Sequence, residues 1–339
     1  MPPLAAILGC AGAQLAAEER RFFARVNPFG FILFARNVEA PQQVGALVAE
    51  LRDVVGRASA PVLVDQEGGR VQRLRPPHWR AAPPAAGFGA LAGLDQAAAV
   101  EAVRLNARLI ADELAALGID TVCAPVLDLR HPGAHDVIGD RAFSADPDIV
   151  ALLGRAACEG FCAGGVAPIV KHMPGHGRSQ VDSHLKVPVV AASLSELDGT
   201  DFRPFRALAD RPLGMTGHLV IRAVDPERPA TVSPRVIAEV IRGRIGFKGV
   251  LISDDLSMQA LAGSIAERAS LAIAAGCDLA LHCNGRMEEM AALADRVPPL
   301  PGKTEARWMA ARPTRAPRDA EPAAMAARVD ELLARAVHA

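Results

Sequence analysis

A fourteen-residue segment from Lys171 to His184 concentrates side chains that can do chemistry. It reads Lys-His-Met-Pro-Gly-His-Gly-Arg-Ser-Gln-Val-Asp-Ser-His, and its glycines and proline predict a loop rather than a helix. Asp182 and His184 stand two apart, so in a loop the carboxylate can accept a hydrogen bond from one imidazole nitrogen. That contact would orient the ring and favour its protonated form. Because histidine titrates near neutrality, His184 can donate a proton and later remove one.

Asp254 is the second candidate, because it directly follows the apolar run Val250-Leu251-Ile252-Ser253. An aspartate with an ordinary pKa of about 3.9 is ionised at neutral pH and needs no activating base. Glycoside hydrolysis with retention requires such a carboxylate on one face of the sugar and a proton donor on the other. The usual donor is a second Asp or Glu, whereas this sequence offers a histidine paired with an aspartate. We therefore predict Asp254 as nucleophile and Asp182/His184 as the acid/base pair.

Two other classes of function stay open from the residues alone. His172, His176, Asp182 and His184 are all acceptable metal ligands, which would suit a metal-dependent hydrolase. However, Pro174-Gly175 lies between His172 and His176, so these two histidines cannot share one helical face as in metalloprotease motifs. A non-catalytic sugar-binding barrel is the other alternative, and it predicts binding without turnover. The non-functional alternative for the segment from Lys171 to His184 is a solvated loop with incidental histidines.

The elements that must position these residues alternate along the chain. Eight short apolar runs are separated by longer amphipathic stretches such as 42–57, 97–117 and 260–275. Continuous apolarity is typical of strands buried on both faces, as in a parallel sheet. We therefore predict a single-domain α/β fold, a (β/α)8 TIM barrel, with an open doubly wound sheet as the alternative. The runs are residues 4–9, 30–34, 61–64, 121–127, 166–170, 213–216, 249–252 and 277–281.

Almost every apolar run ends in polar side chains. Reactive groups of a (β/α)8 barrel belong at the C-terminal ends of its strands, so we expect these side chains to meet at one face. Asp128 and Asp255 have an ordinary alternative as caps of the following helix. The polar ends are Arg36-Asn37, Asp65-Gln66-Glu67, Asp128, Lys171-His172, Gly217-His218, Ser253-Asp254-Asp255 and His282-Cys283-Asn284.

Composition restricts the remaining classes. A formal net charge of -1 gives no electrostatic footprint for nucleic acid or an anionic membrane. No apolar run approaches the roughly 18 residues that span a bilayer, the first residues lack the basic start of a signal peptide, and no Cys-x-x-Cys or nucleotide-binding glycine motif is present. We expect a cytoplasmic barrel over residues 1–300, followed by a tail (301–339) with a terminal helix, and a monomer or weak homodimer.

At the residues named above the chain resembles the family 3 glycoside hydrolases, and more narrowly their bacterial β-N-acetylglucosaminidases of peptidoglycan recycling. The family loop K-H-[FLM]-P-G-H-G-x4-D-[ST]-H matches Lys171 to His184 without a gap, and Ser253-Asp254-Asp255 matches the nucleophile segment. Segments 65–73 and 138–144 resemble sugar-binding segments. Met173, where phenylalanine is commoner, and Gly217, where alanine is usual, are small departures.

The resemblance implies specific roles. Asp65, Arg73, Arg141, Lys171 and His172 would bind the sugar, Asp254 would be the nucleophile, and Asp182/His184 the acid/base dyad. It also implies exo-cleavage of terminal β-linked N-acetylglucosamine from anhydromuramyl-peptide fragments, a retaining two-step mechanism, and no metal or organic cofactor. A β-glucosidase is the main alternative within the family, but the histidine dyad goes with the acetamido-sugar branch.

Overall fold

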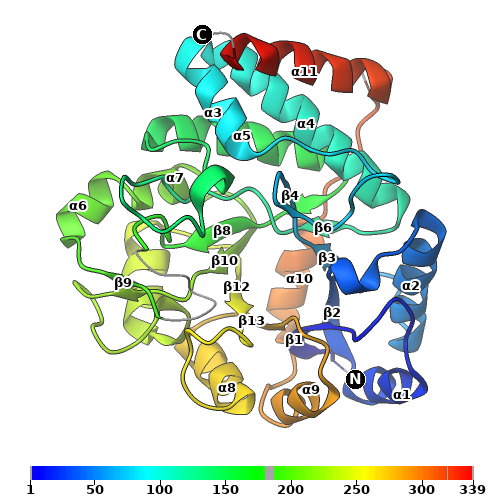
Figure 1. The fold of residues 1–339 in the computed structure, drawn as a ribbon. Coiled ribbons are helices and arrows are strands. Elements are labelled where there is room, and N and C mark those ends of the chain that lie inside the picture. Colours follow the sequence, from blue (N-terminus) through cyan, green and yellow to red (C-terminus); the bar gives the residue numbers. More distant parts are fainter. Residues whose placement is uncertain (1, 180–186, 319, 338–339) are drawn as a thin grey trace.

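A parallel β-barrel surrounded by helices forms the centre of the molecule (Figure 1). The computed structural model describes residues 2–179, 187–318 and 320–337. The main sheet has the order β7-β6-β3-β2-β1-β13-β12-β10-β8, and all its neighbours run parallel. Its strands are β1 Leu4–Gly9, β2 Pro28–Leu33, β3 Val62–Val64, β6 Thr121–Val122, β7 Ala167–Pro168, β8 Val170–Met173, β10 Leu213–Thr216, β12 Val250–Asp255 and β13 Leu279–His282.

The two ends of this sheet, β7 and β8, are consecutive pieces of one strand separated only by Ile169. β7 pairs with β6, and β8 pairs with β10, so the fifth strand position connects both ends of the sheet. Eight strand positions in chain order therefore make a barrel. The predicted (β/α)8 fold is confirmed, and the open-sheet alternative is wrong.

The predicted fourth strand is shorter than its apolar run. Regular pairing stops at Val122, although the run continues to Leu127. Pro125 lies inside the run and has no N–H to give to a neighbouring strand. Its carbonyl instead accepts the N–H of Lys171 (3.2 Å), and the Leu127 N–H donates to the Lys171 carbonyl (2.7 Å). The chain thereby stays attached to the fifth strand without a regular ladder.

Two small sheets lie outside the barrel sheet. The hairpin of β4 (Gln66–Gly68) and β5 (Val71–Gln72) follows the third strand, and β9 (Val189–Val190) pairs with β11 (Val220–Ile221).

Helices cover the outside of the barrel. A π-helix covers Val236–Arg244. The α-helices are α1 Ala17–Val26, α2 Pro41–Val54, α3 Ala85–Leu94, α4 Gln96–Ala116, α5 Pro147–Ala163, α6 Leu194–Gly199, α7 Phe202–Ala207, α8 Ile265–Ala275, α9 Met287–Ala294, α10 Gly302–Ala310 and α11 Pro322–Val337.

Local sequence signals set several of these boundaries. Ser264 caps α8 by accepting the N–H of Glu267, whose side chain returns to the Ser264 N–H in a capping box. Gly276 ends the helix in the left-handed region (φ 116°), where a side chain would be strained. The next strand, β13, begins three residues later, so the glycine turns the chain directly back into the barrel.

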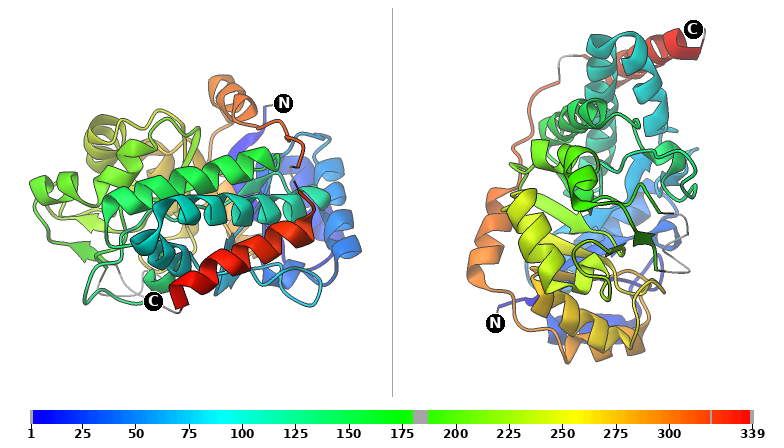
Figure 2. Two further views of the ribbon diagram at one scale, coloured as in Figure 1. Left: turned by 90° about the horizontal axis from the view of Figure 1, so that it is seen from above. Right: turned by 90° about the vertical axis from the view of Figure 1, so that its left-hand side faces the viewer.

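The segment after the last strand packs onto the barrel. Trp308 of α10 is buried and contacts Phe29, at the N-terminal end of β2, edge-on at 5.2 Å. Helix α11 lies along α3 and α4 (Figures 1 and 2), with Met325, Val329 and Leu332 buried. No helix in the described ranges combines the length and apolarity needed to cross a bilayer.

Candidate active site

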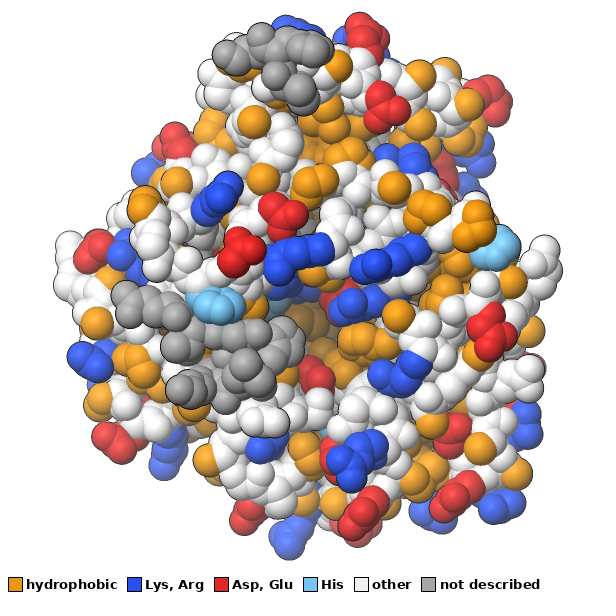
Figure 3. Space-filling view, viewed as in Figure 1, with side chains coloured by type: hydrophobic (Ala, Val, Ile, Leu, Met, Phe, Trp, Pro, Cys, Tyr) orange, Lys and Arg blue, Asp and Glu red, His pale blue; other side chains and the backbone are white. Residues whose placement is uncertain are grey.

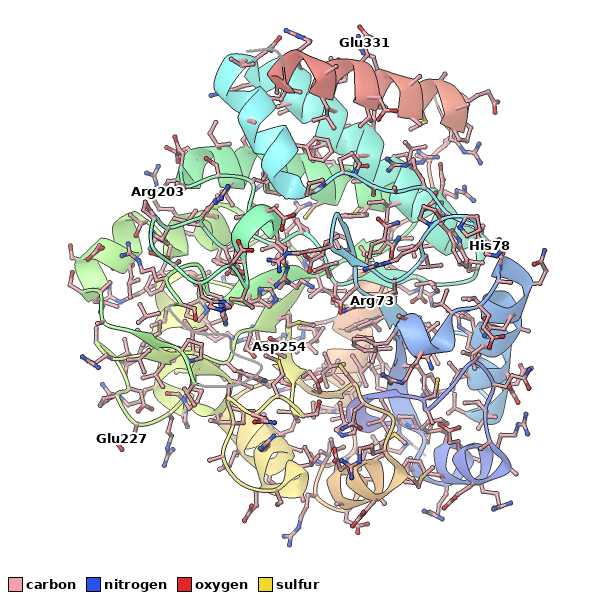
Figure 4. All side chains as sticks on the ribbon, viewed as in Figure 1. Arg73, His78, Arg203, Glu227, Asp254 and Glu331 are labelled. Carbon is pink, nitrogen blue, oxygen red and sulfur yellow. The ribbon has the colours of Figure 1, made fainter. Side chains whose placement is uncertain are left out.

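A pocket opens where the strands end at their C-terminal side. Figure 3 shows a hollow at the centre of this face with basic side chains along its edge, and the labels of Figure 4 place Asp254 and Arg73 there. The residues of the pocket come from strands or loops far apart in the sequence, as expected at this end of a barrel. Its polar lining residues are Asp65, Glu67, Arg73, Arg141, Lys171, His172, His176, Asp254 and Asp255.

An ionic network forms one wall of the pocket. Lys171 of β8 reaches both carboxylates that follow β3, with Nζ 2.8 Å from Asp65 Oδ1 and 2.7 Å from Glu67 Oε1. Arg141 holds Glu67 through two bonds of 2.8 Å each, from Nε to Oε2 and from Nη2 to Oε1. Arg73 Nη2 lies 3.0 Å from Asp65 Oδ2. Each of the three cations and two carboxylates contacts at least one opposite charge, which offsets the cost of placing them in the protein.

The network keeps its members ionised. Burial raises the pKa of Glu67, but the charges of Arg141 and Lys171 outweigh it and lower the pKa to about 2. The pKa of Asp65 is lowered in the same way, because Lys171 and Arg73 overcome its burial. Burial lowers the pKa of Lys171, but Asp65 and Glu67 raise it well above its usual range. The wall therefore presents fixed charges and fixed hydrogen-bonding directions at neutral pH.

An aromatic ring supports the rim of the pocket. Phe34, directly after β2, lies under the guanidinium of Arg73 at 5.0 Å and under that of Arg36 at 5.2 Å. Cations over an aromatic face are attracted by the ring quadrupole. Phe34 thus helps to hold Arg73 against the pocket.

Asp128 anchors His172 and the start of the following loop. Its Oδ2 lies 2.6 Å from His172 Nδ1, and its Oδ1 accepts the backbone N–H of His176 at 2.7 Å. Burial raises the pKa of Asp128, but the charge and hydrogen bond of His172 lower it overall. An ionised Asp128 requires the proton on Nδ1, so Nε2 of His172 is left as the second ring nitrogen for the pocket. Asp128 is therefore not the helix cap that was its alternative.

Asp254, near the end of β12, lines the same pocket as His172 and His176. Its N–H donates to Thr216 Oγ1 (3.3 Å), and its Oδ1 accepts the N–H of Asp255 (2.8 Å). Removal from water raises its pKa, but His218, His172 and the Asp255 N–H together lower it below the ordinary value. The carboxylate is thus ionised at neutral pH.

The neighbouring residue, Asp255, has a structural role. Asp255 accepts the N–H groups of Ser257 (3.0 Å) and Cys283 (3.1 Å), and its carbonyl accepts Nε2–H of His218 (2.9 Å). These bonds fix the turns after β12 and β13. Among the described residues, the carboxylate of Asp254 accepts a hydrogen bond only from the N–H of its neighbour Asp255, so it is not tied to these turns.

The structure brings six of the eight sequence-predicted site residues to one pocket. The remaining two, Asp182 and His184, lie outside the described residues, so their roles stay predictions. The six are Asp65, Arg73, Arg141, Lys171, His172 and Asp254.

Sequence reasoning assigned no role to Glu67 or Asp128 and considered His176 only as a metal ligand. Glu67 stands two residues after Asp65 on the same strand end, which is a signal that could have been used. Asp128 was predicted to lie at the same strand-end face, but its role was left open, because a single aspartate after a strand is common in helix caps. Within the described ranges, no group of three or more His, Cys, Asp or Glu side chains could hold a metal ion.

A barrel pocket of this kind can bind a polyhydroxylated ligand and present an ionised carboxylate to it, which is what a sugar-cleaving enzyme needs. Residues 6–312 match the model of the "Glycosyl hydrolase family 3 N terminal domain". The β-hexosaminidase of Pseudomonas aeruginosa (PAO1 strain) is 43% identical over 295 residues, which cover 85% of this chain and 85% of the relative. The chain therefore belongs to glycosyl hydrolase family 3, and it is a glycoside hydrolase.

Solved structures agree with this membership. NagZ from Neisseria gonorrhoeae in complex with N-trifluoroacetyl-D-glucosamine is 34% identical, with a TM-score of 0.86 over 99% of both chains. NagZ from the same organism in complex with a zinc ion is 33% identical, with a TM-score of 0.85 over 99% of both chains.

Proposed function

We propose that this chain is a retaining exo-β-N-acetylhexosaminidase that releases terminal β-linked N-acetylglucosamine from muropeptides and anhydromuropeptides during peptidoglycan recycling in the cytoplasm. The observation that carries the proposal is Asp254, an ionised carboxylate in a pocket lined by paired charged groups. The names of the similar proteins, β-hexosaminidase and NagZ with a bound glucosamine derivative, support the choice of sugar.

The pocket offers the kind of contacts that sugar hydroxyls need. Asp65 Oδ1 and Oδ2 are held by Lys171 and Arg73, so remaining lone pairs can accept hydroxyl protons while both cations can donate. The ion pairs hold the side chains in place before substrate arrives, which reduces the ordering cost of binding. The terminal sugar binds against this wall, and Arg141 and His172 are its further sugar-binding residues.

The first chemical step forms a bond between an Asp254 carboxylate oxygen and the anomeric carbon. The bond from that carbon to the leaving oxygen breaks, and His184 supplies the proton that the leaving oxygen takes up. In the second step, water attacks the anomeric carbon and gives its proton to His184, and Asp254 leaves as a carboxylate. The role proposed for Asp182 is to orient and polarise this imidazole in both steps.

The first experiment measures nitrophenol release from the β-N-acetylglucosaminide and, in parallel, from the β-glucoside. We expect turnover of the acetamido sugar alone, unchanged by chelator. Asp254→Ala should lose at least 10³-fold in kcat, because it removes the covalent step. Turnover that is indifferent to Asp254, or that disappears in chelator, would contradict the assignment and favour a metal-dependent hydrolase. Sugar binding without turnover would favour the non-catalytic alternative.

A second experiment tests retention and the role of His184. In His184→Ala, nitrophenol needs little protonation to leave, whereas the second step has lost its base. A glycosyl-enzyme should then accumulate, and mass spectrometry should locate the added N-acetylhexosamine on the peptide that contains Asp254. NMR of the wild-type reaction should show the β-anomer as first product; an initial α-anomer would rule out retention. Hydrolysis of a purified muropeptide tests the natural substrate.

A further inference from the structure

His176 is a buried histidine in the pocket that the proposed mechanism does not use. It follows the Pro174-Gly175 turn after β8, and its side chain is only 3% exposed. Its backbone N–H is bound by Asp128, which also holds His172. The backbone of His176 is thus fixed by a contact that does not involve its ring.

Neither ring nitrogen of His176 has a hydrogen-bond partner in the part of the chain that the structure describes. Buried polar atoms without partners are rare, because the loss of water is then uncompensated. The ring lines the pocket together with His172, whose ring centre is 6.0 Å away. The unmet hydrogen-bonding capacity therefore belongs to a residue of the pocket wall.

The ring is neutral at the pH at which most enzymes work. Burial lowers the pKa of His176 to about 4, although the nearby carboxylates of Asp128 and Asp254 act to raise it. A neutral imidazole presents one N–H donor and one nitrogen acceptor. A sugar hydroxyl or acetamido group can both give and accept a hydrogen bond, so it matches this pair of functions.

We propose that His176 is a substrate-binding residue, whose two ring nitrogens exchange hydrogen bonds with polar groups of the terminal sugar. The proposal rests on the proposed function for the identity of that sugar. It explains why a buried histidine is kept without partners in the free enzyme. The uncompensated ring destabilises the empty pocket, and the ligand restores its hydrogen bonds.

The test compares His176→Phe with wild type by calorimetric titration of N-acetylglucosamine and by hydrolysis of its nitrophenyl β-glycoside. Phenylalanine fills the space but cannot hydrogen-bond. We expect Kd and KM to rise about 10- to 100-fold, because polar sugar groups are left unpaired in the pocket. The Tm of the free variant should equal or exceed that of wild type, because an unsatisfied buried polar group has been removed.

Two conservative variants separate binding from packing. His176→Asn places an amide near the position of Nδ1, and His176→Gln places one near Nε2. At least one of them should recover most of the lost affinity, and which one recovers identifies the ring nitrogen that matters. They also serve as the test variants if His176→Phe does not fold.

His282 supplies a matched control. It is equally buried, and within the described ranges its Nδ1 also has no partner. However, it is not among the pocket-lining residues, and its Nε2 pairs with Glu289 at 3.0 Å. His282→Phe should lower the Tm and leave KM within about twofold of wild type.

The outcomes are distinguishable. Wild-type turnover with unchanged Kd and KM in His176→Phe overturns this proposal and leaves the proposed function standing. A large fall in Tm with unchanged Kd shows that the ring is structural, which also overturns it. Absence of both turnover and sugar binding in wild type overturns the proposed function and this proposal together.

Discussion

Glu67 and Arg141 form a doubly bonded ion pair on the pocket wall, and Lys171 shares the same carboxylate. Removing one member of such a group leaves the others as uncompensated charges in a poorly hydrated space. Glu67 consequently contributes to stability as well as to the site. Its depressed pKa sets the pH range in which this contribution is present.

We predict that Glu67→Gln destabilises the protein at pH 7 by about 3 kcal/mol, since a pKa lowered to about 2 from the ordinary value corresponds to that magnitude. The folded-state pKa is depressed, so the stabilisation is fully present above pH 4.5. It is lost as the pH falls from about 4.5 to about 2. Urea unfolding of both proteins at pH 7, 5, 4 and 3 measures this. A difference that stays constant down to pH 3 would disprove the electrostatic account.

At the scale of elements, helix α3 supports the segment that carries Arg141. A Cβ on Gly89 of α3 would lie 1.6 Å from the Phe143 carbonyl oxygen, so helix and segment are in direct backbone contact. Phe143 is two residues from Arg141. The position of the guanidinium therefore depends on the absence of a side chain at residue 89.

We predict that Gly89→Ala forces α3 away from this segment, lowers the Tm and raises KM about tenfold or more, because Arg141 is displaced from Glu67. Gly93→Ala in the same helix is the matched control, since a Cβ there meets nothing within 4 Å. It should keep KM unchanged and stabilise by roughly 0.5–1 kcal/mol through helix propensity. Equal KM values for the two variants would show that α3 does not position Arg141.

The sequence predicted the elements better than the contacts between them. Apolar runs marked the strands because a barrel strand is buried on both faces, which leaves a local signal. The pairing of Asp128 with His172 and the support of Arg141 by Gly89 join residues far apart in the chain, and neither has a local pattern. The family resemblance, through four separate segments of the chain, placed six residues in the pocket, whereas the partners that hold them had to be seen in three dimensions.

At the scale of the whole molecule, α11 joins the far end of the chain to helices from its first third. Val329 and Leu332 are fully buried, and Arg328 holds Glu101 of α4 at 2.8 Å. The helix covers apolar surface of α3 and α4 that would otherwise be exposed. Because α11 packs on α3, and α3 contacts the segment that carries Arg141, α11 supports that segment indirectly.

We predict that a chain ending at Arg318 has a Tm lower by roughly 5–10 °C, from the apolar area that α11 covers. Its KM should rise while its kcat changes little, because Asp254 lies far from α11, whose Glu331 is labelled in Figure 4. Differential scanning calorimetry and steady-state kinetics measure both effects. Arg335→Ala, which removes one exposed ion pair of α11 with Asp95, is the control and should change neither. An unchanged Tm in the shortened chain would show that α3 and α4 need no cover.

The pairing of β1 with β13 also has a consequence for how the protein is made. Ala6 is paired with Ala280, so a ribosome must deliver almost the whole barrel before the first strand gains its second neighbour. Until then the growing chain has an open strand edge, and the apolar faces of α3 and α4 await α11. Open edges and uncovered apolar faces are the features by which newly made chains aggregate. The period of greatest risk for this protein therefore falls late in translation, and chaperone capture should be strongest there.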